Sequence, residues 1–331
     1  MLLNVRFKDD LVFLVDEVLG LFDLDLQLDW KPGAQFSGLL FAHHLGWYRQ
    51  AEINLRIHPW RPFLDPVTVL EQAGHWVVIT EDNLLLKAVH QGNPYRAIGS
   101  MMQYSGLGWV ALKSSGIQSL ADLKGKRIGI HGDGEAGLMI SLAHVGLMPE
   151  DVEIVEIGYD YGELLRSGEY DAVQTLVMVE PLELAAEGFE LTVMPAYEWG
   201  YQVYSEVIAT TQTLIEEQPE LLRRFLGVTI AGWQEAFAQP EQASQVVVEH
   251  YLKESSPGLQ HQILLAIQPL VVGDLGLEGI GQMSADRWAK SIHYLKNTNL
   301  IQESLDPCQV MTTALLPPVG ARLVPDRLAW I

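Results

Sequence analysis

The sequence is poor in cysteine and in basic residues. Cys308 is the single cysteine among 331 residues, which excludes a disulfide framework, a cysteine-based zinc site and a thiol cluster for iron. The chain has 42 acidic against 21 basic residues and a formal net charge of -21. Because phosphate backbones and anionic membranes are bound by clustered lysine and arginine, we expect neither nucleic acid nor a membrane surface as a partner.

Signatures of hydrolases, metal sites and repeats are also missing. No Gly-x-Ser-x-Gly or His-Glu-x-x-His pattern occurs, and no repeat or low-complexity tract stands out. The adjacent histidines His43 and His44 have no ligand-type partner three or four residues further on, so we predict no metal site.

Residues 1–24 are expected to form an amphipathic N-terminal extension. The apolar stretch from Leu11 to Phe22 is interrupted by Asp16 and Glu17, so it is a poor signal peptide and too short and charged for direct membrane insertion. The compartment stays open. It is cytoplasmic as the sequence stands, and periplasmic or at the cell surface if a signal has been lost.

What the chain does have is an alternation of strands and helices. Hydrophobic residues make up 48% of it, enough for a large core, and from Asp25 onward the pattern predicts an α/β protein with mostly parallel sheets. After a first strand that ends near Asp29, the expected strands are Asn54–Pro59, Trp76–Thr80, Tyr95–Gly99, Trp109–Lys113, Arg127–His131, Val152–Ile157, Ala172–Leu176, Leu191–Met194 and Ser205–Thr210. The expected helices are Ser37–Gln50, Pro66–Glu71, Asn83–Gln91, Ser119–Leu123, Glu135–Val145 and Gly162–Gly168, followed by a helical C-terminal part with Pro219–Ala238, Pro240–Glu254, Leu259–Leu270 and Ser284–Leu295.

The stretch from Leu28 to Gly33 places a carboxylate and a large aromatic ring where a strand meets a loop. Apolar and polar residues alternate from Leu24 to Asp29, which indicates a half-buried strand, and Pro32-Gly33 ends it. Residues in such a position commonly bind ligands, which makes Asp29 and Trp30 candidates. The alternative is that Trp30 is a core aromatic residue and Asp29 a turn cap.

Further acids and aromatic residues follow other predicted strands. A flat nitrogen heterocycle needs an aromatic face on which to stack and carboxylates that accept its amino protons. The alternative for each acid is a solvated loop charge. The residues in question are Thr80-Glu81-Asp82, Glu180, Tyr204 and Glu206, with Tyr159, Trp199 and Tyr201 in neighbouring loop segments.

A glycine-rich turn between Arg127 and Gly137 joins a predicted strand to a helix. Backbone N–H groups at such a helix start suit a phosphate, but Asp133 and Glu135 would oppose an anion and favour a cationic or hydrogen-donating group. The alternative is that the two acids cap the helix.

Several motifs together carry a resemblance to a known family over roughly residues 25–305. The motifs are Leu28-Asp29-Trp30-x-Pro with Gly38-Leu39 and Gly46-Trp47-Tyr48, the segment from Ser119 to Gly129, Gly168-Glu169-Tyr170-Asp171-Ala172-Val173, Tyr204-Ser205-Glu206-Val207, and Arg287-Trp288 through Leu300-Ile301. The chain resembles the branch of the type II periplasmic-binding-protein superfamily that unites thiamine pyrimidine synthases with pyrimidine-precursor-binding proteins of ABC transporters.

The resemblance implies two α/β lobes joined by crossover segments, with a ligand cleft between them that closes by a hinge. Lobe one is expected at 25–111 plus 203–331 and lobe two at 112–202. The ligand-binding positions that it implies are Asp29, Trp30, Glu180, Tyr204 and Glu206, with Thr80 and Glu135 as weaker ones.

The sequence departs from the synthases at the positions that carry their chemistry. Those enzymes resemble this chain in fold, but they use a lysine that holds pyridoxal phosphate, a histidine consumed in the reaction and a cysteine-rich iron motif. The lysine position falls near Thr80 and the histidine near Leu84, while Lys87 is expected on the far side of its helix. We therefore predict no cofactor. Phe36 stands where transporter-type relatives usually carry histidine, so the ligand's identity is left open.

Three functions follow in order of preference. The first is a non-enzymatic binding protein for a small heteroaromatic ligand, a thiamine-precursor pyrimidine, which feeds an ABC permease. The second is a pyrimidine synthase of thiamine biosynthesis. The third is a ligand-sensing module of a signalling protein.

Overall fold

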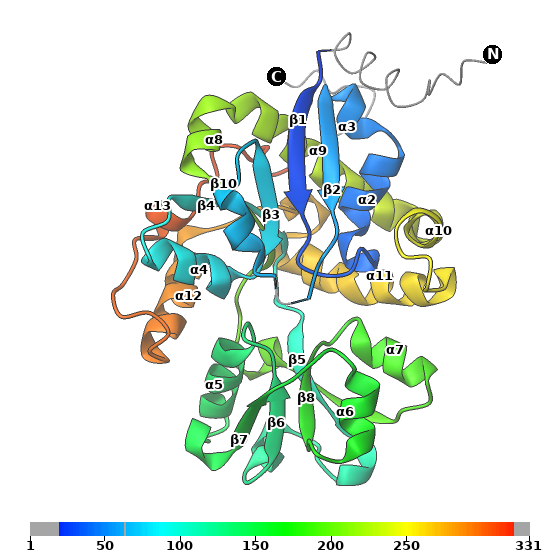
Figure 1. Cartoon of the computed structure of the whole chain (residues 1–331), viewed down its shortest axis with the longest axis vertical. Coiled ribbons are helices and arrows are strands. Elements are labelled where there is room, and N and C mark those ends of the chain that lie inside the picture. Colours follow the sequence, from blue (N-terminus) through cyan, green and yellow to red (C-terminus); the bar gives the residue numbers. More distant parts are fainter. Residues whose placement is uncertain (1–19, 63, 321–331) are drawn as a thin grey trace, which may run out of the picture.

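The computed structural model describes residues 20–62 and 64–320. They form two bodies that lie one above the other along the long axis of the molecule, and each body is built around a five-stranded sheet (Figure 1). The first sheet has the order β2-β1-β3-β10-β4 and the second the order β7-β6-β8-β5-β9. The first consists of β1 (Phe22–Gln27), β2 (Ile53–His58), β3 (Trp76–Thr80), β4 (Tyr95–Met102) and β10 (Ser205–Thr211). The second consists of β5 (Leu107–Leu112), β6 (Arg127–Ile130), β7 (Glu153–Glu156), β8 (Ala172–Leu176) and β9 (Leu191–Pro195).

Both sheets are mixed, but four of the five strands in each sheet run in the same direction, so the α/β class with mostly parallel sheets is confirmed. β1 pairs in parallel with β2 and β3, and β6 pairs in parallel with β7 and β8. In contrast, β10 runs antiparallel to β3 and β4, and β5 runs antiparallel to β8 and β9. The physical reason is the connectivity. β5 and β10 each enter their sheet from the other body, at the edge where the parallel strands end.

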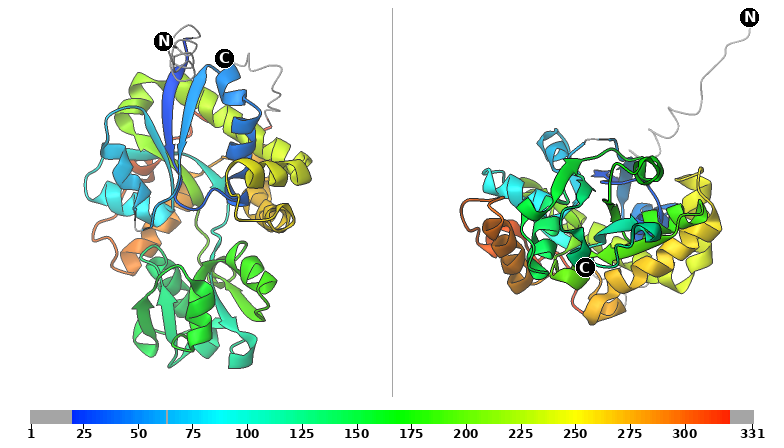
Figure 2. Two further views of the ribbon diagram at one scale, coloured as in Figure 1. Left: turned by 45° about the vertical axis from the view of Figure 1, so that its right-hand side comes forward. Right: turned by 90° about the horizontal axis from the view of Figure 1, so that it is seen from below.

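Two segments of the chain cross between the bodies (Figure 2). The first lies between Met102 and Leu107, and the second between Pro195 and Ser205. The lobe boundary expected between 111 and 112 therefore falls inside β5, a strand that pairs entirely within the second sheet. The extension expected at 1–24 lies outside the described residues as far as residue 19, and β1 begins at Phe22.

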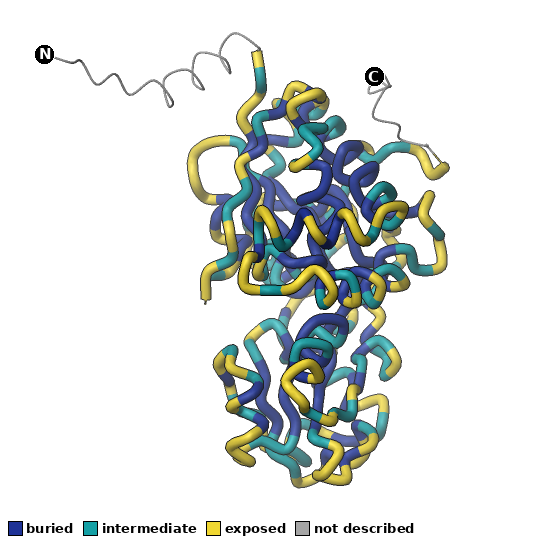
Figure 3. The backbone as a smooth tube through the Cα atoms, turned by 90° about the vertical axis from the view of Figure 1, so that its right-hand side faces the viewer, coloured by how far each residue is buried: buried dark blue, intermediate teal, exposed yellow. Residues whose placement is uncertain are grey.

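Helices cover both faces of each sheet, and the buried residues form the centre of each body (Figure 3). Those of the first body are α2 (Ser37–His44), α3 (Trp47–Gln50), α4 (Asp82–His90), α8 (Gln212–Glu217), α9 (Pro219–Ala238), α10 (Pro240–His250), α11 (Pro257–Val272), α12 (Ala285–Asn297) and α13 (Pro307–Val310). Those of the second body are α5 (Glu135–His144), α6 (Tyr161–Ser167) and α7 (Glu180–Ala186).

Three of the expected helices differ in detail. The helix expected over Ser37–Gln50 is divided into α2 and α3, because Gly46 adopts a left-handed conformation with φ of 74°. The segments Pro66–Glu71 and Leu120–Leu123 are 3-10 helices rather than α-helices.

β1 is buried on both faces, although its alternating pattern indicates a half-buried strand. Leu24 and Leu26 are fully buried, and the polar residues between and after them, Asp25 and Gln27, are 7% and 1% exposed. Asp25 forms an ion pair with Arg56, and Gln27 donates hydrogen bonds to backbone carbonyls. Strands that pair in parallel are commonly covered on both faces, and the buried polar residues of β1 have ion-pair or hydrogen-bond partners within the protein.

None of the helices within residues 20–62 and 64–320 has both the length and the apolar character that a bilayer span requires.

Candidate functional site

A cavity of about 350 Å³ lies between the two bodies and is lined by residues of both. The first body contributes residues that follow β1, β2 and β3, and the second contributes residues that follow β6 and β7 and the end of β8. Parallel strands of both sheets point their carboxyl ends at this space, which is where α/β proteins commonly bind ligands.

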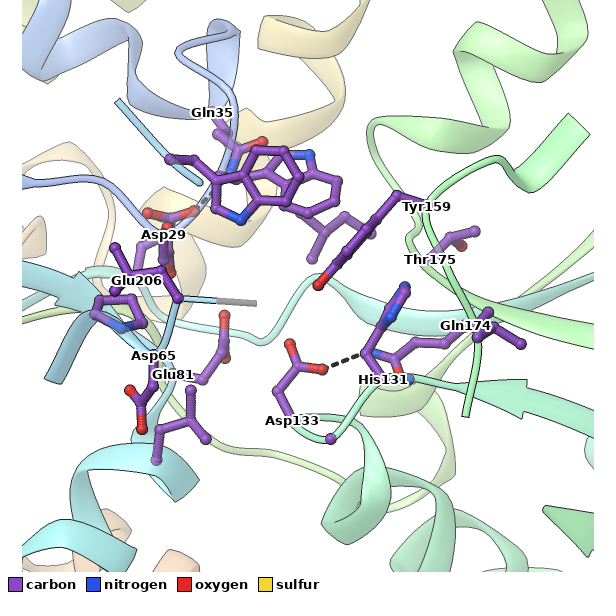
Figure 4. A pocket seen from close by; sticks show the side chains of 18 of the residues that line it. Asp29, Gln35, Asp65, Glu81, His131, Asp133, Tyr159, Gln174, Thr175 and Glu206 are labelled. Atoms are coloured by element: carbon purple, nitrogen blue, oxygen red, sulfur yellow. Dashed lines mark hydrogen bonds between the residues drawn. The ribbon is translucent and has the colours of Figure 1, made fainter. Parts of the chain in front are cut away.

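Aromatic rings from both bodies meet along one side of the cavity (Figure 4). The ring centroid of Trp30 lies 4.7 Å from that of Trp60 and 5.4 Å from that of Tyr159. Tyr159 in turn stacks on His131, with centroids 4.5 Å apart and ring planes 13° from parallel. Trp30 and Trp60 belong to the first body and Tyr159 and His131 to the second, so the aromatic wall bridges them.

Six carboxyl groups also line the cavity, and the side chains that donate hydrogen bonds to three of them are neutral. Glu206 accepts a hydrogen bond from Gln35 Nε2 at 3.1 Å, and Glu81 accepts one from Ser205 Oγ at 2.6 Å. Asp133 accepts one from Gln174 Nε2 at 2.9 Å, as the dashed line in Figure 4 marks.

Asp29 differs from these acids because one of its oxygens is left without a partner. Its Oδ1 is buried and accepts no hydrogen bond from the part of the chain that the structure describes. A buried acceptor of this kind is costly unless a ligand or water donates to it.

Glu206 reaches the cavity through an unusual backbone conformation. Its φ is 50°, in the left-handed region, although it lies within β10. Its neighbours Ser205 and Val207 pair with β4, whereas Glu206 has no partner in the register with β3 or β4. A non-glycine residue in this region is strained by about 1–3 kcal/mol, and such residues concentrate at functional sites.

Burial raises the pKa of the central carboxyl groups. For Asp29, burial together with the charge of Asp133 raises the pKa to about 7. The pKa values of Glu81 and Glu206 lie well above the ordinary value, first because of burial and then because of the charge of Asp29. Among the described residues that line the cavity, none is lysine or arginine that would reverse this effect.

The structure brings three of the seven predicted site residues together at the cavity and places four outside its lining. Asp29, Trp30 and Glu206 line the cavity. Thr80, Glu135, Glu180 and Tyr204 do not.

Each of these four has another position in the fold. Thr80 is fully buried at the end of β3, and Glu135 is the first residue of α5. Glu180, at the start of α7, accepts a hydrogen bond from the backbone N–H of Leu176 at 2.6 Å. The hydroxyl of Tyr204 accepts one from the N–H of Ser284 at 2.9 Å, next to a crossing segment.

Several lining residues were outside the seven predicted site positions, although most carry a signal. Glu81 and Tyr159 are among the acids and aromatic residues expected near strand ends, and Asp133 belongs to the glycine-rich turn. Trp60 follows a predicted strand and His131 ends one. Gln35 and Gln174 also line the cavity, and their sequence context gives no such signal. Phe36, at the position where a histidine was the family expectation, is a core residue that is 2% exposed.

The chain matches the model of a known protein family. Residues 33–243, more than half of the chain, match the family described as NMT1/THI5 like. The chain belongs to this family. The resemblance that the motifs indicate is thereby confirmed.

Three relatives that align with this chain over most of their length differ in what their names describe. A riboflavin-binding protein of Chloroflexus aurantiacus is 25% identical, with 88% of this chain and 85% of the relative aligned. A 4-amino-5-hydroxymethyl-2-methylpyrimidine phosphate synthase of Legionella pneumophila is 27% identical, with 88% and 92% aligned. A formylaminopyrimidine-binding protein of Halalkalibacterium halodurans is 23% identical, with 82% and 84% aligned.

The fold is that of periplasmic binding proteins. The crystal structure of the periplasmic aliphatic sulphonate-binding protein of Escherichia coli superimposes with a TM-score of 0.69 at 16% identity, covering 88% of this chain and 91% of that one.

Proposed function

We propose that this protein is a non-catalytic binding protein that encloses an amino-substituted heteroaromatic molecule, a thiamine-precursor pyrimidine, and delivers it to an ABC permease. The observation that carries the proposal is the combination of an aromatic wall and the unpaired, buried Oδ1 of Asp29 in one cavity between two bodies.

The cavity supplies what an aminopyrimidine ring needs. The indole of Trp30 offers a face for stacking, and the free Oδ1 of Asp29 is an acceptor for an amino or ring N–H donor. Glu206 has a second oxygen beyond the one that Gln35 occupies. A ligand of this size would lie between the bodies, so that its binding favours their closed arrangement.

The names of relatives support a ring ligand of this kind. One is named for formylaminopyrimidine and one for riboflavin, both nitrogen heterocycles. The pyrimidine is preferred to the flavin because two of these relatives are named for a pyrimidine and one for riboflavin.

Synthase activity is the second candidate, since one relative bears that name. The residues of the cavity do not fit pyridoxal phosphate, which needs a lysine amine for its Schiff base and donors for its phosphate. Thr80 and Leu84 occupy the region where the family's lysine and histidine were expected, and Lys87 is not part of the lining. We derive no step through this cofactor.

Calorimetric titration tests the proposal. The purified protein is titrated with 4-amino-5-hydroxymethyl-2-methylpyrimidine, its formylamino analogue and riboflavin. We expect micromolar or tighter binding of a pyrimidine. Binding of riboflavin alone would replace the proposed ligand, and binding of none of the three would refute the proposal. For the second candidate, a lysine-linked absorbance band after incubation with pyridoxal phosphate would argue for the synthase.

A further inference from the structure

The charge of the cavity is one-sided. Six of its lining residues carry carboxyl groups, and its single candidate cation is His131, whose pKa burial lowers from the ordinary value. The six acids are Asp29, Asp65, Glu81, Asp133, Glu156 and Glu206.

The acids are not neutralised by their immediate partners. Glu81, Asp133 and Glu206 accept hydrogen bonds from a hydroxyl or an amide, and none of these bonds comes from a cation. Lys31 lies near Trp30, with its Nζ 6.0 Å from the ring, but it is exposed and is not a lining residue. The lining that the structure describes therefore offers no lysine or arginine to pair with an anion.

Two other uses of an acidic cavity are disfavoured. Among residues 20–62 and 64–320 no three histidine, cysteine or acidic side chains are arranged to hold a metal ion. A phosphate would need arginine, lysine or free N–H groups. The start of α5 is the nearest helix N-terminus in the sequence to His131, and there Asp133 and Glu135 place further negative charge.

We propose that this cavity selects its ligand by charge, so that it accepts an unphosphorylated, basic amino-heteroaromatic ring and rejects the phosphate ester of the same ring. This inference rests on the proposed function and adds to it the chemical state in which the ligand is taken. Recognition would use Asp29, Glu81 and Glu206 as acceptors for the ring's N–H donors.

The charged groups around these three acids also disfavour a bound anion. Asp133 and Asp82 raise the pKa of Glu81 further, and burial followed by the charges of Asp82 and Glu81 raises the pKa of Tyr201. A dianionic phosphate would add charge to a site that already retains protons, whereas a donor or a cation relieves the repulsion.

The direct test compares 4-amino-5-hydroxymethyl-2-methylpyrimidine with its phosphate ester by calorimetry at pH 7 and low ionic strength. We expect the free base to bind at least about 100-fold more tightly, since opposing like charges cost several kcal/mol. Equal affinities, or tighter binding of the ester, would overturn this inference and leave the proposed function standing. Binding of neither compound would instead count against the proposed function.

A matched pair of variants separates charge from shape. Asp133→Asn keeps an acceptor for Gln174 Nε2 and removes one carboxylate from the lining, so the preference for the free base should shrink by about tenfold. The control Glu187→Gln removes a charge from the exposed pair with Arg166, where no change is expected. If Asp133→Asn folds as the parent does by circular dichroism and leaves the preference unchanged, charge selection by the cavity is wrong.

Discussion

Trp30 and Tyr159 touch across the two bodies, with their ring centroids 5.4 Å apart. Trp30 follows β1 of the first sheet, and Tyr159 follows β7 of the second. Asn83 of α4 adds a second bridge, because its Nδ2 donates to the carbonyl of Asp133 at 2.6 Å. Trp30, Tyr159 and Asp133, which line the cavity, therefore also join the two bodies.

The aromatic wall should account for a large part of the affinity. We expect Trp30→Ala to weaken binding of the preferred pyrimidine by about 10- to 100-fold, because it removes a stacking face and a contact between the bodies. The measurement is calorimetric titration. Trp199→Ala is the control, since Trp199 contacts His144 and does not line the cavity. A similar loss in both variants would contradict a stacking role for Trp30.

We expect Glu206 to contribute to ligand binding and to lower the free energy of unfolding. Glycine has no penalty at a φ of 50°, and Glu206→Gly also removes a buried carboxyl group, so we expect the free energy of unfolding to rise by about 1 kcal/mol while binding falls below detection. Urea denaturation and calorimetry measure the two effects. Glu206→Gln retains the strain and should weaken binding without stabilising the fold. Loss of stability in the glycine variant would show that Glu206 is structural.

The sequence predicts a site residue that follows a strand more readily than one that lies within a strand and has an irregular backbone there. Asp29 and Trp30 follow an apolar run and are readily predicted. Glu206 was predicted from a family motif, and its left-handed backbone has no local sign in the sequence. Tyr204 was misplaced because a tyrosine beside a crossing segment has the same pattern as a pocket tyrosine, whereas its hydroxyl is held by the N–H of Ser284.

The direction of β5 and β10 was likewise beyond local patterns. Each is an apolar segment like its neighbours, and only its connection to the other body makes it antiparallel. The lobe boundary at 111 was wrong for the same reason, since hydrophobicity does not distinguish which of two sheets a strand joins.

Arg287 links both crossing segments. Its guanidinium carbon lies 4.3 Å from the ring centroid of Tyr204 and 4.9 Å from that of Tyr104. It also donates to the carbonyl of Val203 at 3.1 Å and to that of Gln103. We expect Arg287→Lys to lower the free energy of unfolding by about 2 kcal/mol, because a lysine retains the charge but cannot make these contacts together.

Urea denaturation measures this change, and Arg223→Lys provides the control at an exposed pair with Glu220. Small-angle scattering of the free protein should also show a larger radius of gyration for Arg287→Lys than for the parent. Parent-like stability together with an unchanged radius would show that Arg287 does not hold the crossing segments.

The free protein should lose stability as the pH rises from about 4 to 8. Burial raises the pKa of Asp29 and of Asp82 to about 7 and that of Glu180 to about 8. The folded state then binds more protons than the unfolded state within this window, so the free energy of unfolding falls with increasing pH. Thermal unfolding of the free protein at pH 5 and pH 8 should show the higher midpoint at pH 5.

Glu180 offers the cleanest test of this dependence, because it lies outside the cavity lining and is 2% exposed. Glu180→Gln keeps an oxygen that accepts from the N–H of Leu176 and removes the ionisation. We expect the variant to match the parent at pH 4 and to exceed its free energy of unfolding at pH 8 by roughly 1–3 kcal/mol. Glu169→Gln, at an exposed position, should follow the parent at every pH. If Glu180→Gln retains the full slope of the parent between pH 5 and 8, the ionisation of Glu180 does not contribute to it, and the charge that destabilises the folded state must lie on the other buried acids.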